Sequence, residues 1–356
     1  MNLLRVTVFI IIKDKFMRIT KNEGITLLSE ENLLTLGKKA DEIRQKKFGN
    51  VATFIIDRNI NYTNICQNEC NFCAFYRRKN NKDAYLLSHE EIIEKVLEAV
   101  ELGATQVMIQ GGLNPELGLD YYEKMLRSIK IQFNITIHSF TATEIQYFAN
   151  LEGISILETL KRLQAAGLDS LPGGGAEILV DTVRKKVSPK KISSYDWLNV
   201  MKIAHSIGMK TTATMVIGFG ETLEQRIEHM EKIRNLQDET GGFRAFIMWS
   251  FQPNNTKLGG EKVSASDYMK TLAFSRIYLE NIEHIQGSWV TQGERIGQLT
   301  LGFGADDLGS IMLEENVVRA AGTSHKMSMQ KMINLIMYTG KIPAQRDTEY
   351  KILKTF

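Results

Sequence analysis

Short apolar runs alternate with longer amphipathic stretches along most of this 356-residue chain. The runs are rich in β-branched residues, which favour strands, and the stretches between them have helical spacing. Strands that alternate with helices predict βαβ units and a parallel sheet. The predicted strands are "VATFIID", "TQVMIQGG", "ITIHSF", "LDSLPGG", "KTTATMVIG", "FRAFIMW", "HIQGSWV" and "TLGFGADD".

Eight such units over roughly 260 residues predict an α/β fold, a closed (β/α)8 TIM-type barrel. A doubly wound open sheet is the main alternative, but no G-x-G-x-x-G turn follows the first strand. One amphipathic helix over 27–47 should lead into the barrel, and helices over 313–338 should close it. We therefore predict one domain, with an N-terminal extension and lead-in helix at 1–50, a barrel at 51–310 and helical closure at 311–356.

The composition is that of a globular protein, with 43% hydrophobic and 24% charged residues. The formal charge of +3 gives no support for a nucleic-acid partner. The apolar segment 6–12 is too short to span a bilayer and has no signal cleavage site after it. The sequence therefore predicts a cytoplasmic protein without a membrane partner. Residues 1–16 are interpreted as an added edge strand or as a segment before the true start at Met17.

All three cysteines of the chain lie within eight positions, directly after the first predicted strand: Cys66, Cys70 and Cys73, in "NICQNECNFCAF". Active sites of such barrels lie at the carboxyl ends of the strands. Disulfides are a poor interpretation of an odd number of thiols in a reducing compartment. A structural zinc usually takes four protein ligands, and so does a cubane iron–sulfur cluster. Three thiolates would leave one iron open for chemistry, which favours an iron–sulfur cluster over zinc or an incidental grouping.

The spacing C-x3-C-x2-C, with Phe72 before the last cysteine, resembles the signature of the radical S-adenosylmethionine (SAM) superfamily. The resemblance implies a [4Fe–4S] cluster on Cys66, Cys70 and Cys73, whose open iron is chelated by SAM. An electron from the cluster would split the sulfonium and yield a 5′-deoxyadenosyl radical, while the protein positions and shields the cofactors. A one-electron donor such as flavodoxin or ferredoxin would then be a partner.

Two glycine-containing stretches resemble SAM-binding segments of that superfamily. "IQGGLNP" stands where the superfamily has Gly-Gly-Glu, although Leu113 replaces the acidic residue, and a tight βα turn is the alternative. "MVIGFGET" resembles the stretch that contacts adenine, where glycine lets the backbone come close. Glu177 could instead be a carboxylate at a helix start. The SAM contacts that the resemblance implies are Phe72, Gln110, Gly111, Gly112, Ser139, Glu177 and Gly218.

"RNINYTNICQNECNFCAFYR" resembles a subgroup that contains aminofutalosine synthases, deazaflavin (FO) synthase components and cyclic dehypoxanthine futalosine synthases. Later segments, including "LPGGGAEILVDTVRKKVSPKK" and "SWVTQGERIGQLTLGFGADDLGS", resemble the last family. The resemblance implies menaquinone biosynthesis with dehypoxanthine futalosine as the substrate. The radical would take the ribose C4′ hydrogen, and the carbon radical would close a ring onto the benzoate. A non-catalytic metal-binding scaffold and a zinc enzyme are the alternatives from other classes.

Side chains near the predicted strand ends are candidates for substrate contact or catalysis. His138 ends the third strand, where it could instead be a buried core histidine. Asp306 and Asp307 are expected to follow the eighth strand, where one could take the rearomatising proton or both could cap a helix. Arg244 would suit a benzoate, but it starts the sixth strand, at the wrong end of the barrel, and is discounted. The candidates are Tyr62, Tyr76, His138, Thr214, Trp249, Trp289, Asp306 and Asp307.

Overall fold

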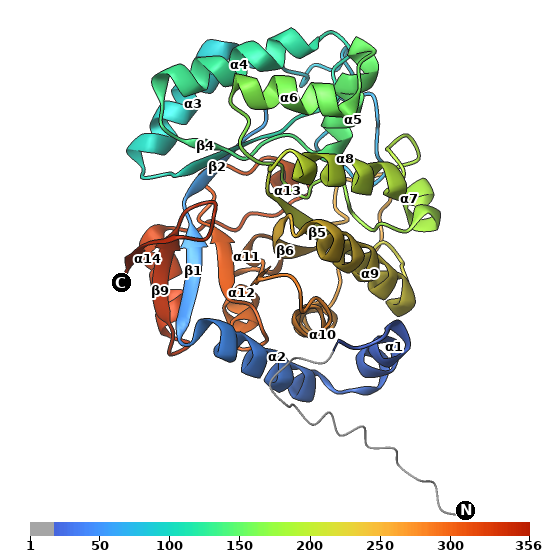
Figure 1. Cartoon of the computed structure of the whole chain (residues 1–356), viewed down its shortest axis with the longest axis vertical. Helices are drawn as coiled ribbons and strands as arrows, with labels where there is room; N and C mark the ends of the chain where they lie inside the picture. Colours follow the sequence, from blue (N-terminus) through green and yellow to red (C-terminus); the bar gives the residue numbers. More distant parts are fainter. Residues whose placement is uncertain (1–17) are drawn as a thin grey trace, which may run out of the picture.

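The computed structural model describes residues 18–356, so the interpretations of residues 1–16 and of Met17 concern a segment outside the described part. Strands alternate with helices through the centre of the chain, as expected for βαβ units (Figure 1). The strands are β1 Val51–Ile55, β2 Asp57–Ile60, β3 Gln106–Ile109, β4 Thr136–Ile137, β5 Thr211–Ile217, β6 Phe243–Ser250, β7 His284–Gln286, β8 Asp307–Ser310, β9 Ile342–Arg346 and β10 Ile352–Thr355. The helices are α1 Lys21–Glu30, α2 Leu33–Phe48, α3 His89–Glu101, α4 Leu119–Gln132, α5 Ala142–Glu152, α6 Ile156–Ala166, α7 Asp181–Val187, α8 Ser194–Ser206, α9 Leu223–Thr240, α10 Ala265–Tyr278, α11 Trp289–Gln292, α12 Glu294–Thr300, α13 Val317–Ala320 and α14 Met329–Met337.

The strands follow the order of a (β/α)8-type barrel. One sheet has the order β10-β9-β1-β8-β7-β6-β5, and a second has the order β2-β3-β4. Isolated parallel bridges, His138 with Ser170 and Leu171 with Thr211, connect β4 to β5 through the predicted fourth strand. Only Ile56 separates β1 from β2. The predicted α/β, TIM-type arrangement is confirmed, but continuous strand pairing does not close the barrel.

The C-terminal region differs from the predicted helical closure. It contains α13 and α14, but its last residues form β9 and β10. β9 runs parallel to β1, with Val51 opposite Ile342, and β10 pairs with β9 in the antiparallel direction. Figure 1 shows this segment, in red, beside the blue β1. Helices therefore lie within the range 313–338 where they were predicted, but the end of the predicted helical closure at 311–356 consists of strands.

The lead-in region forms two helices instead of the single helix predicted over 27–47. α1 ends at Glu30, and the side chain of Asn32 accepts a hydrogen bond from Thr35 N at 2.9 Å to begin α2. Asparagine at this position satisfies a backbone N–H that has no partner within the helix. Leu36 and Ala40 of α2 then pack against Ala273 of α10, below the barrel in Figure 1.

The predicted eighth strand is displaced along the chain. Thr300 ends α12, the following residues form turns around Gly302 and Gly304, and β8 begins only at Asp307. Asp306 and Asp307 therefore lie at the amino end of β8, and the prediction that they follow the strand is wrong. None of the helices within 18–356 combines the length and the apolar character that a membrane crossing requires.

Candidate active site

An open cavity of about 210 Å³ lies where β2, β3 and β4 end. The loops that leave these strands line it, together with the loop at 174–177. This is the end of the barrel at which the sequence places the active site. Nine of the predicted site residues line the cavity: Cys66, Cys70, Phe72, Cys73, Tyr76, Gln110, Gly111, Gly112 and Glu177.

The cysteine loop folds back on itself through hydrogen bonds between its backbone groups. Cys66 N donates to Arg77 O at 3.1 Å, and Cys73 N donates to Cys70 O at 3.1 Å. The three thiols are free, with Cys70 buried and the other two partly exposed. Burial raises the pKa of the Cys70 thiol to about 12 and also raises the pKa of Cys73, while the nearby Lys191 ammonium opposes both shifts. Bound metal would remove these protons, because a coordinating thiol is deprotonated.

The residues present fit a [4Fe–4S] cluster with a polar ligand beside it. Three buried polar atoms of the lining, Asn61 Oδ1, Thr143 Oγ1 and Glu177 Oε2, have no hydrogen-bond partner within the protein. Buried polar groups are almost always paired, so these atoms point to a ligand with donors of its own. Within residues 18–356, no three His, Cys, Asp or Glu side chains are arranged around a single metal ion. In a cubane, each thiolate binds its own iron.

The Gly111–Gly112 turn forms one wall of the cavity. A Cβ at Gly111 would lie 2.7 Å from the ring of Tyr62, and a Cβ at Gly112 would lie 2.2 Å from Ile65 O, so only glycine fits. Tyr62 is buried behind this turn and donates from its hydroxyl to Glu144 Oε1 at 2.9 Å. Gly111 N donates to the same oxygen at 3.0 Å. Tyr62 therefore packs behind the wall of the cavity and does not itself line the cavity.

The end of β5 meets the cysteine loop through aromatic packing. The ring of Phe72 lies 5.4 Å from the ring of Phe219, which follows Gly218. Gly218 has φ 103°, a conformation that favours glycine, and a Cβ there would lie 2.5 Å from Val263 Cγ2. The predicted adenine-contacting stretch thus touches the cysteine loop through Phe219, although Gly218 itself does not line the cavity.

His138 and Ser139 lie in the barrel interior and do not line the cavity. His138 Nδ1 is 2.8 Å from Ser170 Oγ, which also accepts from Arg244. Burial and the positive charge of Arg244 hold the pKa of His138 well below its usual range. Ser139 Oγ accepts from Ile109 N at 2.9 Å. His138 thus has the surroundings of a core histidine.

Three further candidates, two in strands and one at a helix start, do not line the cavity. Thr214 in β5 donates to Gly173 O at 2.5 Å. Trp289 is buried at the start of α11, with Nε1 donating to Ser310 O at 2.9 Å. Trp249 lies half-buried near the end of β6. Their roles in substrate contact stay predictions.

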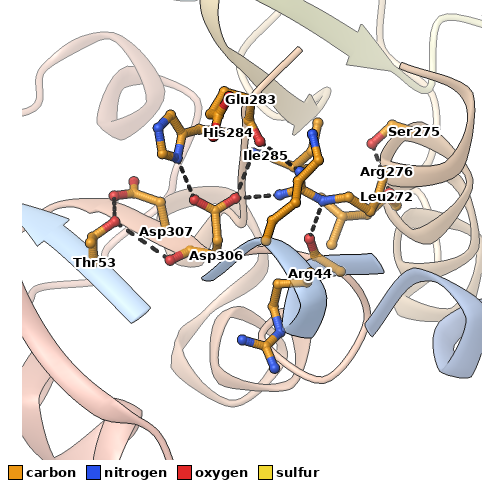
Figure 2. Close-up of polar contacts among 12 residues, drawn as sticks. Arg44, Thr53, Leu272, Ser275, Arg276, Glu283, His284, Ile285, Asp306 and Asp307 are labelled. Atoms are coloured by element: carbon orange, nitrogen blue, oxygen red, sulfur yellow. Dashed lines mark hydrogen bonds and ion pairs between the residues drawn. The ribbon is translucent and has the colours of Figure 1, made fainter. Parts of the chain in front are cut away.

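Asp306 and Asp307 belong to a buried ion-pair cluster at the amino ends of the strands (Figure 2). Asp306 forms an ion pair with Arg276, and its Oδ2 lies 2.6 Å from His284 Nδ1. Asp307 pairs with Arg346 Nε at 2.6 Å. Despite its burial, the charge of Arg276 holds the pKa of Asp306 below its usual range. Both carboxylates have arginine partners at the amino ends of the strands, so neither is placed to accept a proton at the mouth.

Sequence reasoning missed several residues of the cavity lining, among them Asn61, Thr143, Glu144 and Lys191. A signal for Thr143 and Glu144 was present, because Thr141 and Glu144 form a capping box at the start of α5. A helix that begins directly after a barrel strand places its first turn at the mouth. Lys191 belongs to the basic run after α7, which by itself gives no indication of a site.

Comparison with known proteins assigns the chain to a family. The family model described as "Radical SAM superfamily" matches residues 60–233, and "CofH/MqnC C-terminal region" matches residues 240–356. A cyclic dehypoxanthine futalosine synthase of Halalkalibacterium halodurans is 46% identical over 95% of this chain and 92% of its own. This chain belongs to the radical SAM superfamily. Its cofactors are accordingly a [4Fe–4S] cluster and SAM, and Cys66, Cys70 and Cys73 lie within the matched region.

Other members of the superfamily are also similar to this chain. A cyclic dehypoxanthine futalosine synthase of Streptomyces coelicolor is 46% identical over 94% of this chain and 86% of its own. A 5-amino-6-(D-ribitylamino)uracil–L-tyrosine 4-hydroxyphenyl transferase of Methanosarcina barkeri is 40% identical over 93% of this chain and 90% of its own. The crystal structure of methylornithine synthase has a TM-score of 0.74 at 20% identity, covering 92% of this chain and 95% of that one, which shows the shared fold.

Proposed function

We propose that this radical SAM enzyme converts dehypoxanthine futalosine to cyclic dehypoxanthine futalosine in menaquinone biosynthesis. The observation that carries the proposal is the 46% identity with two synthases of that name along nearly the whole chain. The cavity at the barrel mouth supports the proposal, because the three cysteines line it together with three residues that each have a polar atom without a hydrogen-bond partner. The cluster supplies the electron that splits SAM. A one-electron donor protein, flavodoxin or ferredoxin, completes the proposal.

The chain's own residues bind, orient and shield the reactants. The Gly111–Gly112 turn lets the backbone come close to SAM, and Glu177 Oε2 is free to accept from an ammonium or a ribose hydroxyl. Asn61 and Thr143 offer further oxygen acceptors on the same cavity. Fixing the ribose C4′ and the benzoate ring near contact converts ring closure into an intramolecular step. The wall of Phe72, Phe75 and Leu113 limits access of water and stray hydrogen donors.

The direct test is an anaerobic assay with the purified, iron–sulfur-reconstituted protein. Dithionite, SAM and dehypoxanthine futalosine are added, and products are followed by mass spectrometry. We expect 5′-deoxyadenosine and a cyclised product in equal amounts. Protein that carries a cluster and cleaves SAM, but leaves this substrate intact, would contradict the proposed substrate while leaving the family unchanged.

A second candidate follows from the 40% identity with transferases that are named for 5-amino-6-(D-ribitylamino)uracil and L-tyrosine. The same assay with tyrosine and 5-amino-6-(D-ribitylamino)uracil in place of the futalosine separates the two candidates. An aminofutalosine synthase, the other relative expected from the sequence, would require an enolpyruvyl substrate and gives a third arm of the assay.

A further inference from the structure

A buried ion pair, Glu177 with Lys191, lies in the cavity wall beside the cysteine loop. Lys191 Nζ is 2.6 Å from Glu177 Oε1, and the two side chains are 14% and 7% exposed. Within the described chain, Lys191 is the one lysine or arginine that lines this cavity. A charge held this far from water acts on its neighbours with little screening.

The pair is held in place by Arg184, which does not line the cavity. Its guanidinium donates to Gly175 O at 3.2 Å and Ile192 O at 2.7 Å, one on each side of the ion pair. It also donates to Ala176 O. The backbone next to Glu177 and the backbone next to Lys191 are thus fixed to one rigid group.

Glu177 is itself strained. Its φ of 42° lies in the left-handed region, which is unfavourable for a side chain of this kind. Strain of this sort persists where the surrounding structure enforces it, commonly at functional sites. The backbone is held by a hydrogen bond from Val216 N to Glu177 O at 2.8 Å. One carboxylate oxygen is 2.6 Å from Lys191 Nζ, and the other has no hydrogen-bond partner and lies 3.6 Å from Arg184 Nη1.

The Lys191 ammonium also lies close to the cysteine loop. It lies 5.2 Å from the centre of the Phe72 ring, and Phe72 stands between Cys70 and Cys73 in the chain. Lys191 lines the same cavity as Cys66, Cys70 and Cys73. The reduction potential of an iron–sulfur cluster depends on net charge, hydrogen bonding and solvent exposure around it. A fixed cation in the same cavity as the cluster favours the reduced, more negative form of the cluster, and the Glu177 carboxylate opposes this effect.

We propose that Lys191 is a positioning residue that raises the reduction potential of the cluster and fixes the Glu177 carboxylate for the ligand beside it. This inference rests on the proposed function only in that the cluster must be present. It concerns the charge around the cluster and holds for any substrate of the enzyme.

The test is a potentiometric titration of the anaerobically reconstituted holoenzyme without SAM, followed by electron paramagnetic resonance. Lys191→Met removes the charge and keeps the length of the side chain, and we expect a more negative midpoint potential. Lys191→Arg keeps the charge and should stay close to the parent protein. Lys190→Met is the matched control, because Lys190 is the neighbouring residue, 57% exposed and paired with Glu69 at 3.6 Å. It should leave the potential unchanged.

The Glu177→Gln variant tests whether Lys191 acts through its charge, because a merely structural role of the ion pair would not give midpoint potentials that shift in opposite directions in the two variants. It removes a negative charge and leaves Lys191 unpaired, so the midpoint potential should move in the positive direction, opposite to Lys191→Met. It also covers the case in which Lys191→Met fails to fold. Variants that hold four irons and titrate like the parent protein, or shifts of the same sign in both, would overturn the inference. Parent protein that takes up no iron would overturn the proposed function, and the inference with it.

Discussion

Buried polar side chains at the two ends of the barrel differ in whether they have partners within the protein. The mouth is the end at which the strands finish, and the floor is the end at which they begin. At the mouth, Asn61, Thr143 and Glu177 each keep a buried polar atom without a partner. At the floor, Asp306 and Asp307 are buried just as deeply, but Arg276 and Arg346 pair with them. Asp306 and Asp307 have partners without a ligand, whereas the three atoms at the mouth do not. Other buried atoms without a partner, such as Arg44 Nη2 and Arg244 Nε, do not line the cavity, so it is the combination of an unpaired atom and the cavity that marks the active site.

The largest expected effect is at the mouth. Replacing Cys66, Cys70 or Cys73 by Ala should abolish cluster binding and product formation, because each thiolate holds one iron. Iron content and product yield after anaerobic reconstitution measure this, and the free energy of unfolding of the apoprotein should change little for Cys66, which is partly exposed. A variant that keeps full turnover would contradict the ligand assignment.

The next largest effect is at the floor. Asp306→Ala leaves the Arg276 guanidinium buried and uncompensated, so the free energy of unfolding should fall by about 3–5 kcal/mol. Denaturant titration of the apoprotein measures it. Glu239→Ala is the control, because Glu239 pairs with Lys202 at the surface with both side chains more than half exposed, and little change is expected. Equal losses for the two variants would remove the distinction drawn for the floor.

An effect of intermediate size is expected from pH, which should change the free energy of unfolding through His229, a buried residue behind the mouth. His229 is buried, and its Nδ1 accepts from Leu179 N at 2.9 Å, two residues after Glu177. Burial, aided by the positive charges of Arg184 and Lys232, lowers its pKa to about 3. Because the folded-state pKa lies below the unfolded value of about 6.5, this group's contribution to stability is complete above pH 6.5 and is lost as pH falls toward 3, by at most about 1.4 kcal/mol per pH unit.

Urea titrations between pH 7.5 and 5 test this, with His229→Gln and the exposed His325→Gln compared with the parent protein. The first substitution should flatten the dependence on pH below 6.5, and the second should not. An unchanged slope in His229→Gln would show that other groups control stability in this range.

The smallest expected effect distinguishes a buried hydroxyl without a hydrogen-bond partner from a buried hydroxyl that has one. Thr143→Val removes a hydroxyl that has no partner, so the apoprotein should be equally stable or more stable by up to about 1 kcal/mol, while SAM binds several-fold more weakly. Thr159→Val is the matched control, because the buried Thr159 hydroxyl donates to Ser155 O at 3.0 Å, and its loss should cost about 1 kcal/mol. Calorimetric SAM titration and denaturation measure both. A loss of stability in Thr143→Val would contradict the assignment.

The mouth was predictable where its chemistry lies in consecutive residues. The cysteine loop and the Gly111–Gly112 turn both follow strands whose existence the apolar runs indicated, and the fold then places them together. Lys191 and Thr143 were missed because they reach the cavity from segments far apart in the chain. Neither has a local pattern that distinguishes it from a solvated lysine or a helix-start threonine.

The floor was mispredicted for a different reason. "TLGFGADD" has the apolar composition of a strand, but the turns at Gly302 and Gly304 end the preceding helix within it. Only the pairing of Asp306 with Arg276, on a distant helix, shows which end of the strand the carboxylates occupy. β9 was missed because Pro343 and Gln345 are poor strand residues, and its stability comes from pairing with β1.

The pairing of β9 with β1 also constrains how the protein can be made. β1 is the first strand of the barrel to leave the ribosome, and β9 ends only ten residues before the C-terminus. The first strand therefore waits for nearly 300 further residues before its edge is covered, and such distant contacts form slowly. A chain that stops before residue 342 would lack β9 and expose this edge of β1 to other chains, which favours aggregation.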